Sequence, residues 1–149
     1  MGHTIHLSIP PRNDHLALVR RVVSTAAGVV DDLTDRRIDD LSLAVSEACA
    51  NAIDAQRAIG ELSPVAIQIE LRDAAVAVTV TDHAGGFSPD AVDPLPAVED
   101  PGRLRHENGL GLPLMRSLSE SVTFERTGDG TAVRIEVRGA DPEKWDDQG

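Results

Sequence analysis

The sequence predicts an α+β fold, a two-layer α/β sandwich in which a mostly antiparallel sheet carries its helices on one face. Segments with the alternating pattern of strands occur in pairs separated by short turns, which is typical of hairpins. Two segments with helical periodicity precede the first of these pairs, and a third lies between the two pairs. The chain has 149 residues, of which 41% are hydrophobic, and this is enough for one packed core.

The N-terminal segment predicts a strand followed by an amphipathic helix. Residues 4–9 alternate between apolar and polar side chains, and Pro10 and its neighbouring proline end the strand. Asn13 or Asp14 is expected to cap the helix, because short polar side chains accept hydrogen bonds from the first free amides. Apolar residues at helical spacing extend this helix to about Val30.

A second helix is expected over residues 35–59, with Gly60 ending it because glycine adopts the left-handed conformation at helix ends. Its apolar residues recur on one face and should form a buried stripe. The stripe consists of Leu41, Val45, Ala48 and Ala52. Cys49, on the same helix, is interpreted as a packed thiol rather than a nucleophile.

Two hairpins complete the predicted sheet. The first pairs residues 65–71 with 76–80 around a turn at residues 73–74, and the second pairs 122–126 with 132–138 around a Gly-Asp-Gly turn.

Between the hairpins lie an irregular segment and a third helix. Residues 82–108 are rich in proline and glycine, and a loop this long is more often a functional lid than a connector. A helix is expected over 109–119. We interpret residues 1–140 as a single domain and residues 141–149 as a polar tail.

Charge and composition exclude several functions. The formal net charge is −11, so a nucleic-acid backbone or an anionic membrane would repel the chain. No apolar run approaches the roughly 20 residues that span a bilayer. A single cysteine excludes an intrachain disulfide, and we expect a cytoplasmic protein.

One face of the second helix carries oxygen donors. Glu47, Asn51 and Asp54 lie at i, i+4 and i+7, which places them on the same face. Oxygen ligands one turn apart suit Mg²⁺, which keeps waters and phosphates as its other ligands. From spacing alone, an ordinary solvated helix face is the favoured interpretation of these residues.

Three later segments have weaker signals. Asp82 ends a buried strand and precedes two glycines, an arrangement that lets a backbone approach a ligand. The Gly-Leu-Gly at residues 109–111 opens a helix, and adjacent amides there suit an anion. Gly130 and Thr131 open the last strand. Each segment alone is also compatible with an ordinary turn.

Taken together and in this order, the four segments resemble those of the GHKL (Bergerat-fold) ATPases, which include gyrase-type ATPases and histidine-kinase catalytic domains. The matching motifs are Glu47-x-x-x-Asn51, Asp82-x-Ala84-x-Gly86, Gly109-x-Gly111-Leu112 and Gly130-Thr131. The resemblance covers nearly the whole chain. Residues 44–52 and the two helices resemble the branch of bacterial anti-sigma factor serine/threonine kinases.

The resemblance implies a role for each matching position. Asn51 would ligate the Mg²⁺ that bridges the ATP phosphates, and Glu47 would be the base for the attacking hydroxyl. Asp82 would read the adenine amino group with help from Thr131, and Gly86 would line the adenine pocket. The phosphate-binding segment would consist of Gly109, Leu110, Gly111 and Leu112. Either Arg103 or Arg105 of the lid would reach a phosphate.

Two residues depart from the family pattern. Ala84 replaces the first glycine of the Asp-x-Gly-x-Gly motif, which would shift the loop if that position needs a positive φ. Asp54 occupies a position that is basic in many relatives, so it adds negative charge beside the phosphates.

The resemblance implies an ATP-dependent anti-sigma factor that phosphorylates a Ser or Thr of an anti-anti-sigma (STAS-type) partner and works as a homodimer. Arg20 and Arg21 of the first helix are either solvated or part of its partner surface. Two alternatives remain: a nucleotide-binding interaction module without kinase activity, and a detached histidine-kinase catalytic domain.

Overall fold

The computed structural model describes residues 2–85 and 111–139. The elements in chain order are β1 (His3–Ile9), the 3-10 turn η1 (Asn13–His15), α1 (Leu16–Ala27), α2 (Asp35–Ala58), β2 (Val65–Arg72), β3 (Ala75–Thr81), α4 (Gly111–Leu118), β4 (Ser121–Arg126) and β5 (Thr131–Arg138). Most of the predicted lid (residues 86–108 of the segment 82–108) and the boundary at residue 140 lie outside the described residues, so both stay predictions.

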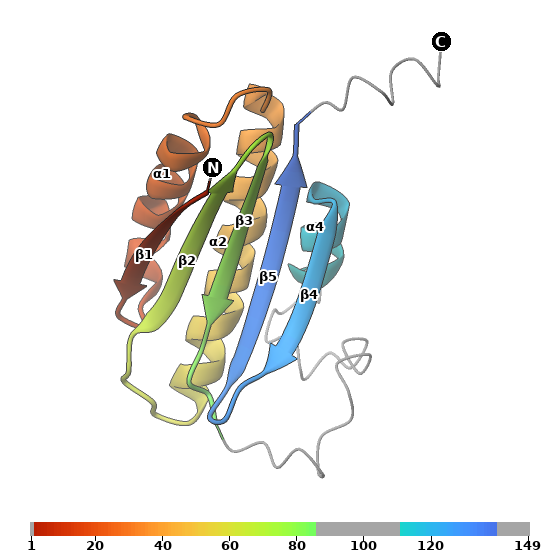
Figure 1. Cartoon of the computed structure of the whole chain (residues 1–149). Helices are drawn as coiled ribbons and strands as arrows, with labels where there is room; N and C mark the ends of the chain where they lie inside the picture. Colours follow the sequence, from red (N-terminus) through yellow and green to blue (C-terminus); the bar gives the residue numbers. More distant parts are fainter. Residues whose placement is uncertain (1, 86–110, 140–149) are drawn as a thin grey trace.

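The five described strands form one sheet in the order β1-β2-β3-β5-β4, and every neighbouring pair is antiparallel. The described helices α1, α2 and α4 lie on one face of this sheet (Figure 1). The predicted α+β two-layer class and both predicted hairpins are therefore confirmed. The two hairpins are joined by the pairing of β3 with β5, in which Val80 lies opposite Val133 and Thr81 opposite Ala132.

The core lies between α2 and the middle of the sheet. The four residues of the predicted α2 stripe are at most 4% exposed, and they pack with the inward side chains of β2, β3 and β5. Each fully buried valine or leucine contributes roughly 1.5–3 kcal/mol relative to an exposed one. Cys49 is fully buried, and burial raises the pKa of its thiol to about 12. The interpretation of Cys49 as a packed thiol is confirmed. No described helix is long and apolar enough to cross a membrane.

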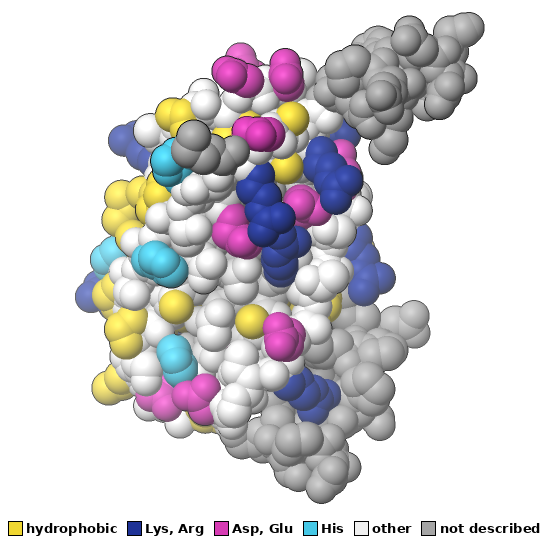
Figure 2. Space-filling view, in the orientation of Figure 1, with side chains coloured by type: hydrophobic (Ala, Val, Ile, Leu, Met, Phe, Trp, Pro, Cys, Tyr) yellow, Lys and Arg dark blue, Asp and Glu magenta, His cyan; other side chains and the backbone are white. Residues whose placement is uncertain are grey.

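The face of the sheet away from the helices is polar (Figure 2). Arg134 reaches Glu70 at 3.6 Å between Nε and Oε2, and Arg138 pairs with Glu136 at 3.3 Å. The Arg134–Glu70 pair crosses from β5 to β2, while Arg138 and Glu136 both lie on β5. Ala77 of β3 lies between Glu70 and Glu136, and it is only 1% exposed although it faces away from the helices. The sheet therefore has one apolar side, as two layers require.

The start of the first helix differs from the prediction. Asn13 and Asp14 form the turn η1 and cap no helix, and α1 begins only at Leu16, without a side-chain cap. The Asp14 carboxylate is bound instead by Arg12, at 2.7 Å. The helix also ends at Ala27 rather than near Val30, because the amides of Val29 and Val30 donate to carbonyls three residues earlier, of Ala26 and Ala27.

The second helix ends as the sequence predicts. Gly60 adopts a φ of 69°, and its N–H donates to the Arg57 carbonyl at 3.2 Å. The next amide, of Glu61, donates to the Gln56 carbonyl at 2.8 Å, which completes a Schellman motif. This ending turns the chain sharply towards β2 and keeps residues 61–63 close to Gln56.

Glycines allow the β4–β5 turn to lie against the end of β3. A Cβ on Gly130 would collide with the carbonyl oxygen of Asp82 and lie 2.8 Å from its Oδ1. A Cβ on Gly85 would lie 2.8 Å from the Asp129 carbonyl oxygen. Both contacts are main-chain contacts that side-chain rotation cannot relieve.

We expect Gly130→Ala to lower the free energy of unfolding by about 2–3 kcal/mol, because the added methyl must push two backbone segments apart. Gly128→Ala is the matched control, since a Cβ there meets nothing within 4 Å. Urea denaturation of both variants measures the difference. Equal stabilities would mean that the close approach of Gly130 to Asp82 is not required.

Candidate functional site

The face of α2 that the sequence singled out is half-buried rather than freely solvated. Glu47, Asn51 and Asp54 are all partly covered. The side-chain oxygen of Asn51, Oδ1, is fully buried, and nothing in residues 2–85 or 111–139 donates a hydrogen bond to it. A buried acceptor without a donor costs about 1–3 kcal/mol, so the oxygen is suited to a ligand that arrives from outside the fold.

The donor chemistry at this position fits Mg²⁺. An amide oxygen is a ligand that Mg²⁺ accepts, and Glu47 supplies a carboxylate one helical turn away. Among the described residues, no group of three or more His, Cys, Asp or Glu side chains could hold a metal alone. A divalent ion here would therefore depend on Asn51 together with water and the phosphates of a ligand.

The N-terminal end of α4 points towards the same part of α2. Arg37, in the first turns of α2, pairs with Glu120, just after α4, at 2.7 Å. Since α4 packs on α2 and its C-terminal end lies near Arg37, α4 runs antiparallel to α2, and its first residues lie further along α2 in the direction of Glu47. The amides at a helix N-terminus favour anions, so this placement suits a phosphate.

Asp82 and Thr131, which the sequence treats as two separate signals, lie together. The Asp82 amide donates to the Thr131 carbonyl at 2.9 Å, and the Thr131 amide donates to Asp82 Oδ1 at 3.2 Å. The same Oδ1 accepts from the Ala84 amide at 3.0 Å. Among the described residues none donates to Oδ2, which leaves that oxygen to accept a hydrogen bond from a ligand.

The pKa of Asp82 is raised, mainly because burial disfavours its charged form. The hydrogen bonds from Ala84 and Thr131 act in the opposite direction and lower this pKa. Asp82 as a whole is only 9% exposed. A buried acid at the end of a strand is a feature that packing alone does not require.

Ala84 does not distort the loop. It is buried and 9% exposed, and its φ is not among the positive values found in the described residues, which belong to Asp32, Ala74 and Gly60. The position therefore does not need glycine, and the departure from the family motif is tolerated.

The remaining predicted residues are only partly described. Gly86, Arg105, Gly109 and Leu110 lie outside the described residues. Gly111 and Leu112 form the start of α4.

Sequence reasoning missed Gln56, which is fully buried near the end of α2. Its Nε2 donates to the Ser63 carbonyl, and its Oε1 accepts from the His83 amide, both at 2.7 Å. A signal was present, because Gln56 follows Ala52 by four residues and so continues the apolar stripe. A polar residue at a buried position needs hydrogen-bond partners, and here they come from two other segments.

The fold is a two-layer α+β domain with a candidate ligand site beside α2. A family model described as the histidine kinase-like ATPase domain matches residues 9–137. The chain belongs to the histidine kinase-like ATPase family.

Relatives support the predicted branch of this family. A protein of Halalkalibacterium halodurans is 30% identical over 129 residues, covering 82% of this chain and 75% of its own length. A protein of Bacillus pumilus is 30% identical over 137 residues, covering 87% and 82%. Both carry the name serine-protein kinase RsbW. The predicted resemblance to the GHKL superfamily and its anti-sigma kinase branch is confirmed.

A solved structure shares the fold. The crystal structure of the RsbU and RsbW domains of a Mycobacterium tuberculosis protein matches with a TM-score of 0.66 and 17% identity. The match covers 94% of this chain and 33% of the other, so the chain spans about a third of that protein's structure. At this identity the likeness shows the fold alone.

We expect Asp82→Asn to raise the free energy of unfolding at neutral pH. Because the pKa of Asp82 is higher in the folded chain, the folded state binds its proton more tightly, and stability falls as pH rises from the ordinary value of 3.8 through the raised pKa. Asparagine removes the buried charge and keeps an oxygen for both amides.

Urea denaturation at decreasing pH measures this effect, with Asp31→Asn as the exposed control. The extra stability of Asp82→Asn over the wild type should disappear at a pH low enough that Asp82 of the wild type is protonated in both the folded and the unfolded chain. A variant that is less stable than the wild type at neutral pH would contradict the account.

Proposed function

We propose that this chain is an ATP-dependent anti-sigma factor of the cytoplasm. It holds a sigma factor and transfers a phosphoryl group to a Ser or Thr of an anti-anti-sigma partner of the STAS type. One observation carries the proposal: the buried Oδ1 of Asn51, which no described residue hydrogen-bonds, lies one turn from Glu47 in a chain of the histidine kinase-like ATPase family. The relatives' name, serine-protein kinase, supports a Ser or Thr hydroxyl as the acceptor of the phosphoryl group.

The nucleotide would lie between the Asp82–Thr131 pair at the end of β3 and the Asn51 position on α2. Its adenine amino group donates to Asp82 Oδ2, and Thr131 assists from the neighbouring strand. Its phosphates point towards Asn51 and the start of α4, with Gly109 to Leu112 as the phosphate-binding segment. When bound by Asn51 Oδ1, Mg²⁺ would neutralise charge on the phosphates.

Glu47 is the proposed base. The partner hydroxyl oxygen forms a bond to the γ-phosphorus as the bond from that phosphorus to the β-phosphate oxygen breaks, and ADP leaves. The hydroxyl proton passes to the Glu47 carboxylate. Phosphoryl transfer needs positioning and charge neutralisation more than covalent chemistry from the protein, which suits a site with so few groups.

The outer face of the helix pair is the proposed partner surface. Arg20 and Arg21 line an open hollow of about 570 Å³ between α1 and α2, together with Leu43, which is 41% exposed. Leu18, on the same helix as the two arginines, is 48% exposed. Cations beside exposed leucines suit a partner with acidic and apolar side chains. A homodimer would present this surface twice.

One observation favours a second candidate, a nucleotide-binding interaction module without kinase activity. Asp54 is half-buried three residues after Asn51, so its charge lies close to the proposed phosphate position. Such a module would bind ADP and a sigma factor but transfer no phosphate.

We expect Glu47→Gln to slow labelling of a cognate STAS partner by radioactive ATP about 100-fold or more, the range for loss of a general base. Binding of ADP should change little. Glu125→Gln, an exposed carboxylate on β4, is the control for the lost charge and should label the partner like the wild type.

Equal labelling by wild type and Glu47→Gln would overturn the catalytic role of Glu47. Binding of ADP without any labelling by the wild type would favour the interaction module instead. If no nucleotide raises the melting temperature, neither candidate stands.

A further inference from the structure

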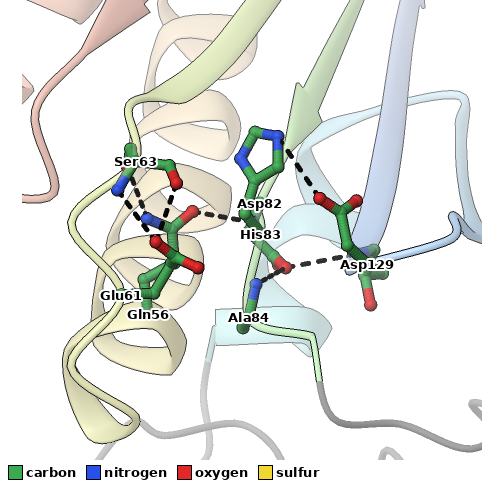
Figure 3. A network of polar contacts seen from close by, with 8 residues as sticks. Gln56, Glu61, Ser63, Asp82, His83, Ala84 and Asp129 are labelled. Carbon is green, nitrogen blue, oxygen red and sulfur yellow. Dashed lines mark hydrogen bonds and ion pairs between the residues drawn. The ribbon is translucent and has the colours of Figure 1, made fainter.

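Gln56 is the most buried polar side chain of the described core, with an exposed fraction of 0%. A buried amide is costly unless its donor and acceptor are both used. The partners also fix its orientation, because the Ser63 carbonyl can only accept and the His83 amide can only donate. Gln56 therefore ties α2 to two other segments through their main chains (Figure 3).

The segment that carries Asp82 is held at three successive amides. The Asp82 amide donates to Thr131 on β5, the His83 amide to Gln56 on α2, and the Ala84 amide to the Asp82 side chain. Of these three bonds, only the one to Gln56 connects the segment to a helix. In the sequence, the His83 amide that makes this bond lies between the amides of Asp82 and Ala84, whose bonds both involve Asp82.

The other end of this connection is anchored as well. Ser63 donates to Glu61 Oε2 from its amide at 3.2 Å and from its hydroxyl at 2.8 Å. The Glu61 amide in turn donates to the Gln56 carbonyl at 2.8 Å. Gln56 is thus held from both sides and has little freedom to move away from His83.

Gln56 also lies on the helix that carries the proposed phosphate-side residues. It follows Asn51 by five residues, which corresponds to about 7.5 Å along a helix axis. One side chain therefore links the position of Asn51 to the position of the Asp82 carboxylate.

We infer that Gln56 is a positioning residue that holds Asp82 where it can select adenine over other bases. The inference rests on the proposed nucleotide site. Gln56 touches no ligand; it acts through the main chain of His83. Without it, the carboxylate remains but its distance from the adenine amino group is no longer fixed.

The test compares two nucleotides by calorimetry, ADP with Mg²⁺ and purine riboside 5′-diphosphate with Mg²⁺, which lacks the 6-amino group. Wild type should prefer ADP about 10-fold or more, as expected for one hydrogen bond to a charged group. Gln56→Met should lose most of this preference while its affinity for the deamino analogue changes little. Gln68→Met, a half-buried glutamine of β2, is the matched control and should keep the preference.

Gln56→Glu separates positioning from stability. A glutamate of the same length still accepts from the His83 amide in either protonation state, so this variant should keep the preference for ADP even where its melting temperature is lower. The inference would be overturned if, across all variants, the preference for ADP over the deamino analogue fell in proportion to the melting temperature.

Hydrogen exchange in the wild type tests the same connection without a substitution. The His83 amide should exchange more slowly with ADP bound than with the deamino analogue, and equal protection would contradict the inference. If Gln56→Met keeps the preference that wild type shows, the inference fails and the proposed site stands. If wild type binds neither nucleotide, both fail.

Discussion

The close approach of the β4–β5 turn to the end of β3 is the constraint on which the candidate site depends. It requires Gly130 to have no side chain, because a Cβ there would occupy the space of the Asp82 main chain. With that approach in place, the Thr131 amide reaches the Asp82 carboxylate, although the two residues are 49 positions apart in the chain. The site at the sheet end is thus a consequence of the pairing of β3 with β5.

The site combines groups that the fold alone would not favour. Asn51 Oδ1 is buried and receives no hydrogen bond from residues 2–85 or 111–139, and Asp82 carries a carboxyl group whose pKa burial raises. Each lowers the stability of the fold, whereas the neighbouring stripe of α2 is apolar and tightly packed. Buried polar groups that lower the stability of a fold are concentrated at sites that bind a ligand. Gln56 is the contrasting case, because both its amide nitrogen and its amide oxygen are hydrogen-bonded.

The sequence alone predicted the parts of the structure that depend on local pattern. The two hairpins, the buried stripe of α2 and the end of that helix at Gly60 follow from alternation, helical spacing and backbone freedom. The predicted cap of α1 was wrong. The Asp14 carboxylate pairs with Arg12 instead, and capping propensities do not take such an ion pair into account. The tolerance of Ala84 was also undecidable from sequence, since it depends on a backbone angle.

The candidate site was predictable only in part for the same reason. Spacing placed Glu47 and Asn51 on one helix face but could not reveal that Asn51 Oδ1 is buried, because burial depends on how other segments pack around the helix. The partners of Gln56 lie 7 and 27 residues away, so no local pattern reveals them.

The central claim is that one nucleotide joins Asn51 on α2 to the Asp82–Thr131 pair. Nuclear magnetic resonance of the nitrogen-15-labelled chain with ADP, first with Mg²⁺ and then with paramagnetic Mn²⁺, tests it most directly. The account predicts that Mn²⁺ broadens the Asn51 side-chain amide most strongly, and that ADP shifts the amides of Ala84 and Thr131 while those of β1 stay unchanged. Broadening centred on another acidic part of the chain, with ADP bound and Asn51 unaffected, would contradict it.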